Sequence, residues 1–162
     1  MELIERINEN DVVIGQSDFN IVHKNLLLHR SVHVFIADNE GKLFCRKITQ
    51  KNPIYPGYWS TSAGYHVLIG NDYDKTAQES VKSLLGIKCR LEMIGKLRVM
   101  DEKENELSAT YVGHSGKVKV NANEIEDGKF FTAEEIRHLA ETEKCTPHLL
   151  ASLELYLSKQ KS

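Results

Sequence analysis

The sequence is short of features that define whole classes of protein. Its 162 residues include three cysteines, three prolines and one tryptophan, and 21 Lys and Arg are nearly balanced by 23 Asp and Glu. Cys45, Cys89 and Cys145 are odd in number and far apart, so neither a disulfide framework nor a zinc knuckle is expected. The near-neutral charge also argues against a dedicated nucleic-acid binder, which usually carries a basic stripe.

Long hydrophobic runs are absent as well. No stretch approaches the roughly 20 apolar residues that a membrane-spanning helix needs. The first residues, Met-Glu-Leu-Ile-Glu-Arg, carry acids and lack the apolar centre of a signal peptide. The sequence therefore predicts a cytoplasmic protein without membrane association, and its length fits a single domain.

The first two-thirds of the chain favour strands. Val32, Val34 and Ile36 alternate with residues of the opposite face, which is the period of a β-strand. Asn-Glu-Gly at 39–41 supplies turn chemistry, and residues 43–48 are predicted to return as the second strand of a hairpin. Further strands are predicted near 90–99, 106–112 and 129–131.

Three helices are predicted. Residues 72–85 place apolar side chains at helical spacing, with Asp72 as the N-cap and Gly86 as the stop signal. A capping-box pattern at Thr132 begins a short helix that ends near residue 140. Thr146 followed by Pro147 begins a last helix. Strands and helices in this order predict an α+β domain with a mixed sheet between helical layers.

Two segments carry a resemblance to a known family. The stretch from Tyr55 to Gly70, followed by a helix that ends at Gly86, resembles the Nudix superfamily, and most of all the branch of isopentenyl-diphosphate isomerase and related Nudix hydrolases. The resemblance implies an α/β/α sandwich with a mixed β-sheet, formed by one Nudix-like domain over 1–162. Within it, 1–28 would be an N-terminal strand extension, 64–87 the Nudix box and 146–160 the C-terminal helix.

The box departs from the family pattern at its working positions. Anchored on Gly86, the first glutamate of the pattern is Asn71, and the three helix glutamates are Ser80, Ser83 and Leu84. Carboxylates at helix positions i, i+3 and i+4 share one face, where they would bind Mg²⁺. The degenerate box therefore predicts that Mg²⁺-dependent hydrolysis is lost or strongly reduced.

The resemblance also implies a second set of polar residues. Isopentenyl-diphosphate isomerases bind one metal ion through histidines and paired acids, and the corresponding residues are His29, His66, Glu104 and Glu106, with His23 aligned loosely. Imidazoles with carboxylates suit Zn²⁺ or Mn²⁺, with Mg²⁺ as a further option. The alternative is a set of separate polar residues around a pocket, and no organic cofactor is expected.

Substrate-binding positions follow from the same resemblance. Basic residues that hold a diphosphate in this branch correspond to Arg46, Lys47 and Lys51, and Arg and Lys bind phosphate well. Exposed strand-end charges are the alternative interpretation. Trp59 is a candidate for stacking on a base, although packing of its loop against the sheet is the simpler role.

These residues leave three functions open. The first is a domain that binds a nucleotide or other diphosphate compound without hydrolysing it. The second is an active hydrolase of nucleoside diphosphate derivatives that uses acids outside the box, such as Glu104, Glu106 or Glu124. Isomerase activity ranks last: Glu106 corresponds to the catalytic glutamate, but Gly64 replaces the catalytic cysteine and His148 an aromatic residue. A homodimer or a protein partner is compatible with each function.

Overall fold

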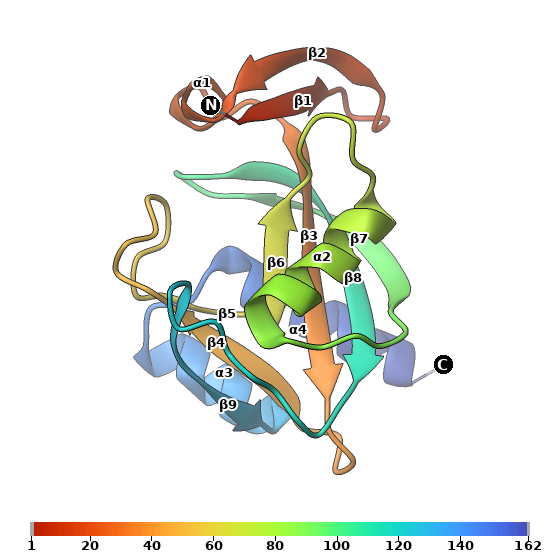
Figure 1. Ribbon diagram of the computed structural model, residues 1–162, viewed down its shortest axis with the longest axis vertical. Helices are drawn as coiled ribbons and strands as arrows, with labels where there is room; N and C mark the ends of the chain where they lie inside the picture. The colour runs from red at the N-terminus through yellow and green to blue at the C-terminus, as the bar shows by residue number, and fades with distance from the viewer. Residues whose placement is uncertain (1, 162) are drawn as a thin grey trace.

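The computed structural model describes residues 2–161, which form one mixed β-sheet with helices on both faces (Figure 1). Its strands are β1 Leu3–Ile7, β2 Val13–Asp18, β3 His29–Ala37, β4 Leu43–Ile48, β5 Trp59–Ser60, β6 Ala63–His66, β7 Glu92–Met100, β8 Asn105–His114 and β9 Ile125–Phe131. Its helices are α1 Phe19–Lys24, α2 Tyr73–Leu85, α3 Ala133–Thr142 and α4 Pro147–Gln160. The expected α+β sandwich is confirmed.

Strand β3 runs through the centre of the fold. It pairs in parallel with β8 and antiparallel with β6, and successive side chains of a strand point to opposite faces. Val32, Val34 and Ile36 lie in one hydrophobic core with α2, whereas Phe35 and Ala37 lie in a second core with α3 and α4. Figure 1 shows α2 and α4 on the two sides of this strand.

The predicted starts of α2, α3 and α4 and the predicted end of α2 are confirmed, whereas α3 extends to Thr142, two residues beyond its predicted end. Asp72 caps α2 by accepting a hydrogen bond of 2.8 Å from the backbone N–H of Lys75. Gly86 ends the helix with a φ of 63°, a left-handed conformation that glycine adopts without a Cβ penalty. The capping box of α3 joins Thr132 and Glu135 in both directions.

The predicted hairpin forms only at its turn. Strand β4 pairs with β3 at a single position, Ala37 with Leu43, and then pairs along its length with β9. The reason is that β6 and β8 already occupy the two edges of β3, so β4 diverges and builds the other half of the sheet. The N-terminal segment, predicted only as a strand extension, forms the β1–β2 hairpin and α1.

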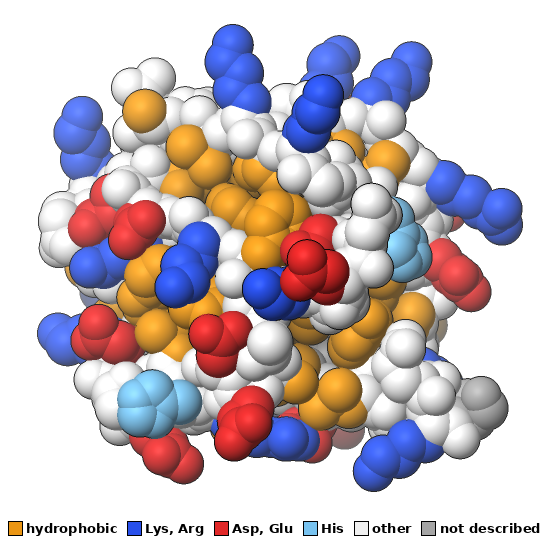
Figure 2. Space-filling model, turned by 90° about the horizontal axis from the view of Figure 1, so that it is seen from below, with side chains coloured by type: hydrophobic (Ala, Val, Ile, Leu, Met, Phe, Trp, Pro, Cys, Tyr) orange, Lys and Arg blue, Asp and Glu red, His pale blue; other side chains and the backbone are white. Residues whose placement is uncertain are grey.

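The surface carries charges of both signs. On the face seen from below, Asp and Glu are mixed with Lys and Arg across the middle and lower parts, around several hydrophobic patches, whereas only Lys and Arg project from the upper edge (Figure 2). Among residues 2–161, no helix is both long and apolar enough to span a membrane.

Candidate metal-binding site and cavity

Polar side chains from four neighbouring segments converge at one end of the sheet. His29 on β3 is in register with Glu106 on β8, and Ser31 on β3 is in register with His66 on β6. Glu104 lies two residues before Glu106, so both carboxylates project to the same side. Helix α1, which lies outside the sheet, contributes His23 to the same group of side chains. We call this set the metal-site cluster: His23, His29, His66, Glu104 and Glu106.

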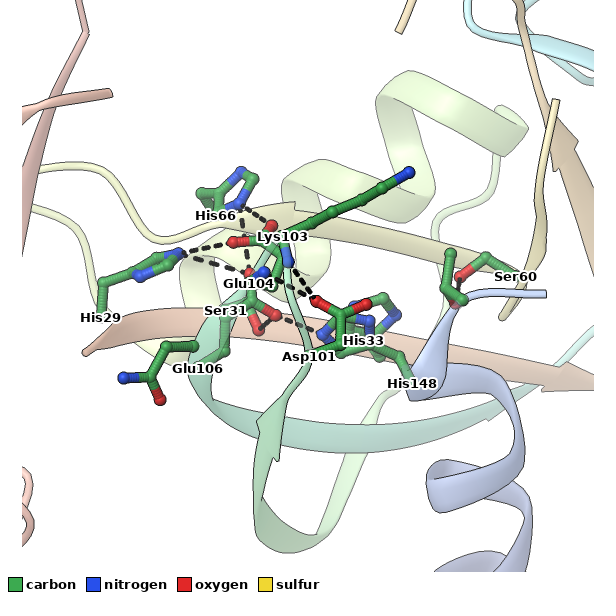
Figure 3. A network of polar contacts seen from close by, with 12 residues as sticks. His29, Ser31, His33, Ser60, His66, Asp101, Lys103, Glu104, Glu106 and His148 are labelled. Carbon is green, nitrogen blue, oxygen red and sulfur yellow. Dashed lines mark hydrogen bonds and ion pairs between the residues drawn. The ribbon is translucent and has the colours of Figure 1, made fainter. Parts of the chain in front are cut away.

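The donor atoms of the metal-site cluster lie at short range. Glu104 Oε1 is 2.7 Å from His23 Nε2 and 3.3 Å from His29 Nε2, and Glu104 Oε2 is 2.8 Å from His66 Nε2. The Nε2 atoms of His23 and His66 are 3.2 Å apart. Glu106 Oε2 is 3.2 Å from His66 and 3.4 Å from His29. Figure 3 shows His29, His66 and the two glutamates of this cluster close together.

Two of the imidazoles are oriented by the backbone. His23 Nδ1 donates to the carbonyl of Phe19 at 2.8 Å, and His29 Nδ1 donates to the carbonyl of Leu27 at 2.8 Å. With Nδ1 engaged in this way, Nε2 of each ring faces the centre of the cluster. Metal-binding histidines are characteristically fixed by such a second hydrogen bond.

The metal-site cluster brings ionisable histidines and glutamates together in the protein interior. Burial opposes protonation of His29 and His66, but hydrogen bonds with Glu104 and Glu106 outweigh it and raise the pKa of His29 to about 9 and of His66 to about 10. Burial and the neighbouring Glu106 oppose ionisation of Glu104, yet the three histidines lower its pKa to about 2. Positive charge is therefore required between these carboxylates, as protons or as a cation.

A second group lies beside the first and shares one carboxylate. Glu106 Oε1 accepts a hydrogen bond of 2.9 Å from Ser31 and contacts Nε2 of His148. The rings of His33 and His148 stack at 4.1 Å with an interplanar angle of 14°. Imidazole lone pairs lie in the ring plane, so two nearly parallel stacked rings cannot direct them to one ion. This group therefore forms a polar wall and is not a second metal site.

A cavity of about 260 Å³ opens onto both groups. Its lining combines three of the imidazoles (His33, His66 and His148) and the carboxylates of Glu104 and Glu106 with residues 52–55 of the loop that joins β4 to β5. The volume approaches the lower end of the range typical of small-molecule sites, roughly 300–1,000 Å³. A small ligand bound here would contact the metal-site cluster directly.

The predicted substrate-binding residues separate in space. Arg46 lines the cavity, is 7 % exposed and donates from Nη1 to the carbonyl of Thr61 at 2.7 Å. Lys47 lies 3.6 Å from Glu126 outside the cavity lining, and Lys51 is exposed. Trp59 packs edge-on against Phe131 at 5.5 Å in the second core.

The helix positions of the box also lie in different surroundings. Ser80 is fully buried and donates to the carbonyl of Ala77, whereas Ser83 is exposed and accepts from Tyr65. Leu84 is 3 % exposed and lines the cavity. Glu124 is an exposed acid at the same cavity.

Neither His33 nor Ser31 is among the residues predicted for the site. The sequence pattern could have indicated both residues, because His29, Ser31 and His33 recur at a period of two and so share one face of β3. His148 was noted only as the replacement of an aromatic residue. Its contact with Glu106 depends on how α4 packs across the sheet, which no local pattern specifies.

The chain was compared with known proteins. No family model matches it. It is 27 % identical to an uncharacterised Nudix hydrolase of Pseudomonas aeruginosa, covering 96 % of this chain and 94 % of the relative. It is also 27 % identical to an isopentenyl-diphosphate Delta-isomerase of Aromatoleum aromaticum, covering 76 % of this chain and 73 % of the relative.

Solved structures show the same architecture. The protein DR0079 from Deinococcus radiodurans superposes with a TM-score of 0.76 at 19 % identity, covering 90 % of this chain and 93 % of that one. The NUDIX domain of Shewanella oneidensis NrtR, complexed with ADP ribose, has a TM-score of 0.65 at 10 % identity, covering 82 % and 87 %. The chain has the Nudix fold and resembles in sequence both Nudix hydrolases and isopentenyl-diphosphate isomerases.

Proposed function

We propose that this protein binds a nucleotide or another diphosphate compound in the cavity, beside a divalent cation held by the metal-site cluster. One observation carries the proposal. His29 Nε2 and Glu104 Oε1 are buried and lie 3.3 Å apart, and their ion-pair contacts, which include His23 Nε2 at 2.7 Å from Glu104 Oε1, are all with members of the metal-site cluster and lack the geometry of a good hydrogen bond. Buried polar atoms are normally paired, and a cation between the two would satisfy both.

The donor set fits a transition-metal ion. With bonds of about 2.0 Å, the ligand atoms of a tetrahedral Zn²⁺ site lie about 3.3 Å apart, and the distances within the cluster run from 2.7 to 3.4 Å. Three imidazoles favour Zn²⁺ or Mn²⁺ over Mg²⁺, which prefers an all-oxygen shell with several waters. Such an ion would supply positive charge for the oxygens of a diphosphate.

Arg46 supports an anionic ligand in the same cavity. Its guanidinium is buried and forms no ion pair with a carboxylate among residues 2–161. Burial lowers its pKa to about 10, which still leaves it charged at neutral pH. A buried cation without a counter-ion is costly, and a phosphate group would balance it. The NUDIX domain complexed with ADP ribose gives an example of such a ligand on this fold.

We further propose that Mg²⁺-dependent hydrolysis is lost or strongly reduced, because the box positions offer two hydroxyls and a hydrocarbon. One observation favours a second candidate, an active hydrolase: Glu124 presents a carboxylate at the cavity, with Glu104 and Glu106 nearby. Isomerase-type chemistry ranks below both, since Gly64 provides no side chain that could transfer a proton.

Metal analysis tests the proposed cation site, and ligand-binding measurements test the proposed binding of a diphosphate compound. We expect about one Zn²⁺ or Mn²⁺ per chain in the wild type, and much less after His29→Gln or Glu104→Gln, whereas exposed His138→Gln should retain it. Metal-loaded protein should bind inorganic pyrophosphate or ADP but release little phosphate or nucleoside monophosphate with Mg²⁺. Absence of metal binding contradicts the cation site, and rapid turnover that is lost in Glu124→Gln establishes the second candidate.

A further inference from the structure

The interface between helix α4 and strand β8 contains a row of buried polar side chains that continues from the metal-site cluster. On β8, Ser108 and Thr110 follow Glu106 at a period of two, so the three side chains project to the same face of the sheet. On α4, His148 and Ser152 lie one helical turn apart. All five residues are at most 3 % exposed. Buried polar groups are normally paired, so their partners indicate what each side chain does.

The two carboxylate oxygens of Glu106 face different groups. Oε2 lies 3.2 Å from His66 and 3.4 Å from His29, within the metal-site cluster. Oε1 accepts a hydrogen bond of 2.9 Å from Ser31 and contacts Nε2 of His148. Because the carboxylate is one planar group, the partners that hold Oε1 also set the direction in which Oε2 points. The orientation of His148 therefore affects how Glu106 faces a cation.

The imidazole of His148 has no hydrogen-bond partner at its other nitrogen. Nδ1 is buried and makes no hydrogen bond within residues 2–161. The ring also stacks on His33, with 4.1 Å between the ring centroids. Stacking keeps the two rings nearly parallel but does not fix where each nitrogen lies within the ring plane. A second hydrogen bond, at Nδ1, is needed to hold Nε2 against Glu106.

Ser108 supplies a second unpaired atom in the same interface. Its Oγ is buried and has no hydrogen-bond partner in the described part of the chain. Two residues before it on β8, Glu106 contacts His148. Two residues after it, Thr110 Oγ1 lies 3.5 Å from Ser152 Oγ. Side chains on one face of a strand recur about every 7 Å, and the turns of a helix about every 5.4 Å, so Ser108 lies beneath the turn of α4 between these two contacts.

We infer that one internal water molecule joins His148 Nδ1 to Ser108 Oγ, and that this bridge makes His148 a positioning residue for Glu106. The inference rests on the proposed cation site and specifies how one of its ligands is held. Water and a hydroxyl can each donate or accept, so the bridge forms with either protonation state of the imidazole.

The neighbouring hydroxyls can complete the coordination of this water. The 3.5 Å separation of Thr110 Oγ1 and Ser152 Oγ is longer than an ordinary O–H···O hydrogen bond, so both groups retain hydrogen-bonding capacity. Buried waters typically make about three hydrogen bonds to polar groups that would otherwise be unpaired. The α4–β8 interface offers that number of partners around His148 and Ser108.

A high-resolution crystal structure and nitrogen NMR of the imidazoles test the bridge on the full-length protein, and neither needs a bound metal. We expect one ordered water within about 3.2 Å of both His148 Nδ1 and Ser108 Oγ. The Nδ1 resonance of His148 should shift in Ser108→Ala, whereas Ser158→Ala, at an exposed position of the same helix, should leave it unchanged. A protein atom paired with Nδ1 in place of water, or an unchanged resonance in Ser108→Ala, would overturn the bridge.

Metal affinity tests the positioning role. Loss of a group that orients a metal ligand costs about 10- to 100-fold in affinity, so we expect a loss of this size in His148→Asn and about three- to tenfold in the more distant Ser108→Ala. A glutamine amide can reach the position of Nε2, so His148→Gln should retain more affinity than His148→Asn, whose amide replaces Nδ1. Competition with a chromogenic chelator measures Zn²⁺ affinity, and Ser158→Ala should match the wild type.

The visible absorption of the Co²⁺-loaded protein separates positioning from a purely structural role, because it reports the geometry of the ligands around the ion. The spectrum of Ser108→Ala should differ from that of the wild type. Reduced stability of this variant with unchanged metal affinity and an unchanged Co²⁺ spectrum would show that Ser108 only supports the fold, and the inference would be wrong. A wild type that binds no metal would contradict the proposed cation site and the positioning role together, whereas the water bridge is decided by the crystal structure and the NMR.

Discussion

The phenol of Tyr55 donates a hydrogen bond of 2.8 Å to Asp101 Oδ2 and so joins the loop over the cavity to the turn that carries Glu104. Asp101 Oδ1 accepts the backbone N–H groups of Lys103 and Glu104, each at 2.8 Å. Lys103 Nζ also lies 4.7 Å from the ring centre of Tyr58 in the same loop. One aspartate therefore contacts both the loop that lines the cavity and the residue that contributes a donor to the metal-site cluster.

Tyr55→Phe should weaken metal binding without unfolding the protein. The change removes one hydrogen bond to Asp101 and leaves the ring in place, so the Glu104 turn loses part of its support. Loss of a group that orients a metal ligand typically costs 10- to 100-fold in affinity, and for this more distant contact we expect about three- to tenfold. Competition with a chromogenic chelator measures it. Tyr156→Phe, which removes a phenol on α4 beside Phe35 and outside the cavity lining, should match the wild type.

Gly64→Ala should destabilise the fold because the new methyl meets backbone. Its contact with the Val32 oxygen at 2.8 Å cannot be relieved by rotating a side chain, and overpacking of this kind costs about 1–3 kcal/mol. Urea denaturation gives the free energy of unfolding. Gly15→Ala is the matched control on another strand, where the nearest atom is 3.7 Å away. Equal stability of the two variants would show that β6 can shift away from β3.

Asp11→Asn should destabilise the protein at neutral pH but not in acid. Asp11 has a φ of 63° and accepts 2.6 Å and 2.9 Å hydrogen bonds from Arg30 on β3 and Lys96 on β7, which tie the β1–β2 turn to these two strands. Burial opposes its ionisation, yet these two cations outweigh it and lower the pKa. Asparagine tolerates the left-handed backbone, so the substitution removes the charge, and with it one of the two oxygen acceptors, without adding backbone strain.

The sign of this pH dependence follows from the direction of the shift. A carboxyl whose folded-state pKa lies below its unfolded value of 3.8 contributes stability above that value and loses it as the pH falls through the folded pKa. We expect a loss of about 1 kcal/mol at pH 7 in Asp11→Asn, as for a partly exposed charged hydrogen bond. Thermal unfolding from pH 7 to pH 3 should show the two proteins converge. A constant difference over that range would contradict the charge explanation.

Glutamates introduced at the two neighbouring positions Ser83 and Leu84 should differ in their effect on stability. Ser83 is exposed, so Ser83→Glu should change stability by less than about 0.5 kcal/mol. Leu84 is 3 % exposed in the first core, and Leu84→Glu would place a carboxylate there at a cost of at least about 2 kcal/mol. Urea denaturation with and without Mg²⁺ measures both. Full tolerance of Leu84→Glu would show that the cavity still accepts the carboxylate of the family pattern.

Local chemistry was enough to predict several elements. Asp72 and Gly86 mark the ends of α2, and Thr132 with Glu135 marks the start of α3, because caps and stop signals act within one helical turn. The alternation along β3 gave the strand but not its partners. The predicted pairing of β3 with β4 failed beyond one position, since strand order depends on contacts far apart in sequence. In the same way, the box helix was placed correctly, but the burial of Leu84 against the cavity was not foreseen.

The sequence by itself determined the helices α2, α3 and α4, the strands β3, β4, β7, β8 and β9, and the absence of carboxylates at positions 80, 83 and 84, because these follow from residue type and spacing. Only the tertiary structure decided which histidines meet. His23 on α1 reaches Glu104 across 81 positions of sequence, and His148 on α4 reaches Glu106 only because the helix begins above that strand. The tertiary structure also placed Arg46 in the cavity and Trp59 in the core, although the two residues lie 13 positions apart on paired strands. Side-chain direction and burial are set by how the sheet and helices pack together, and spacing along the chain does not contain that information.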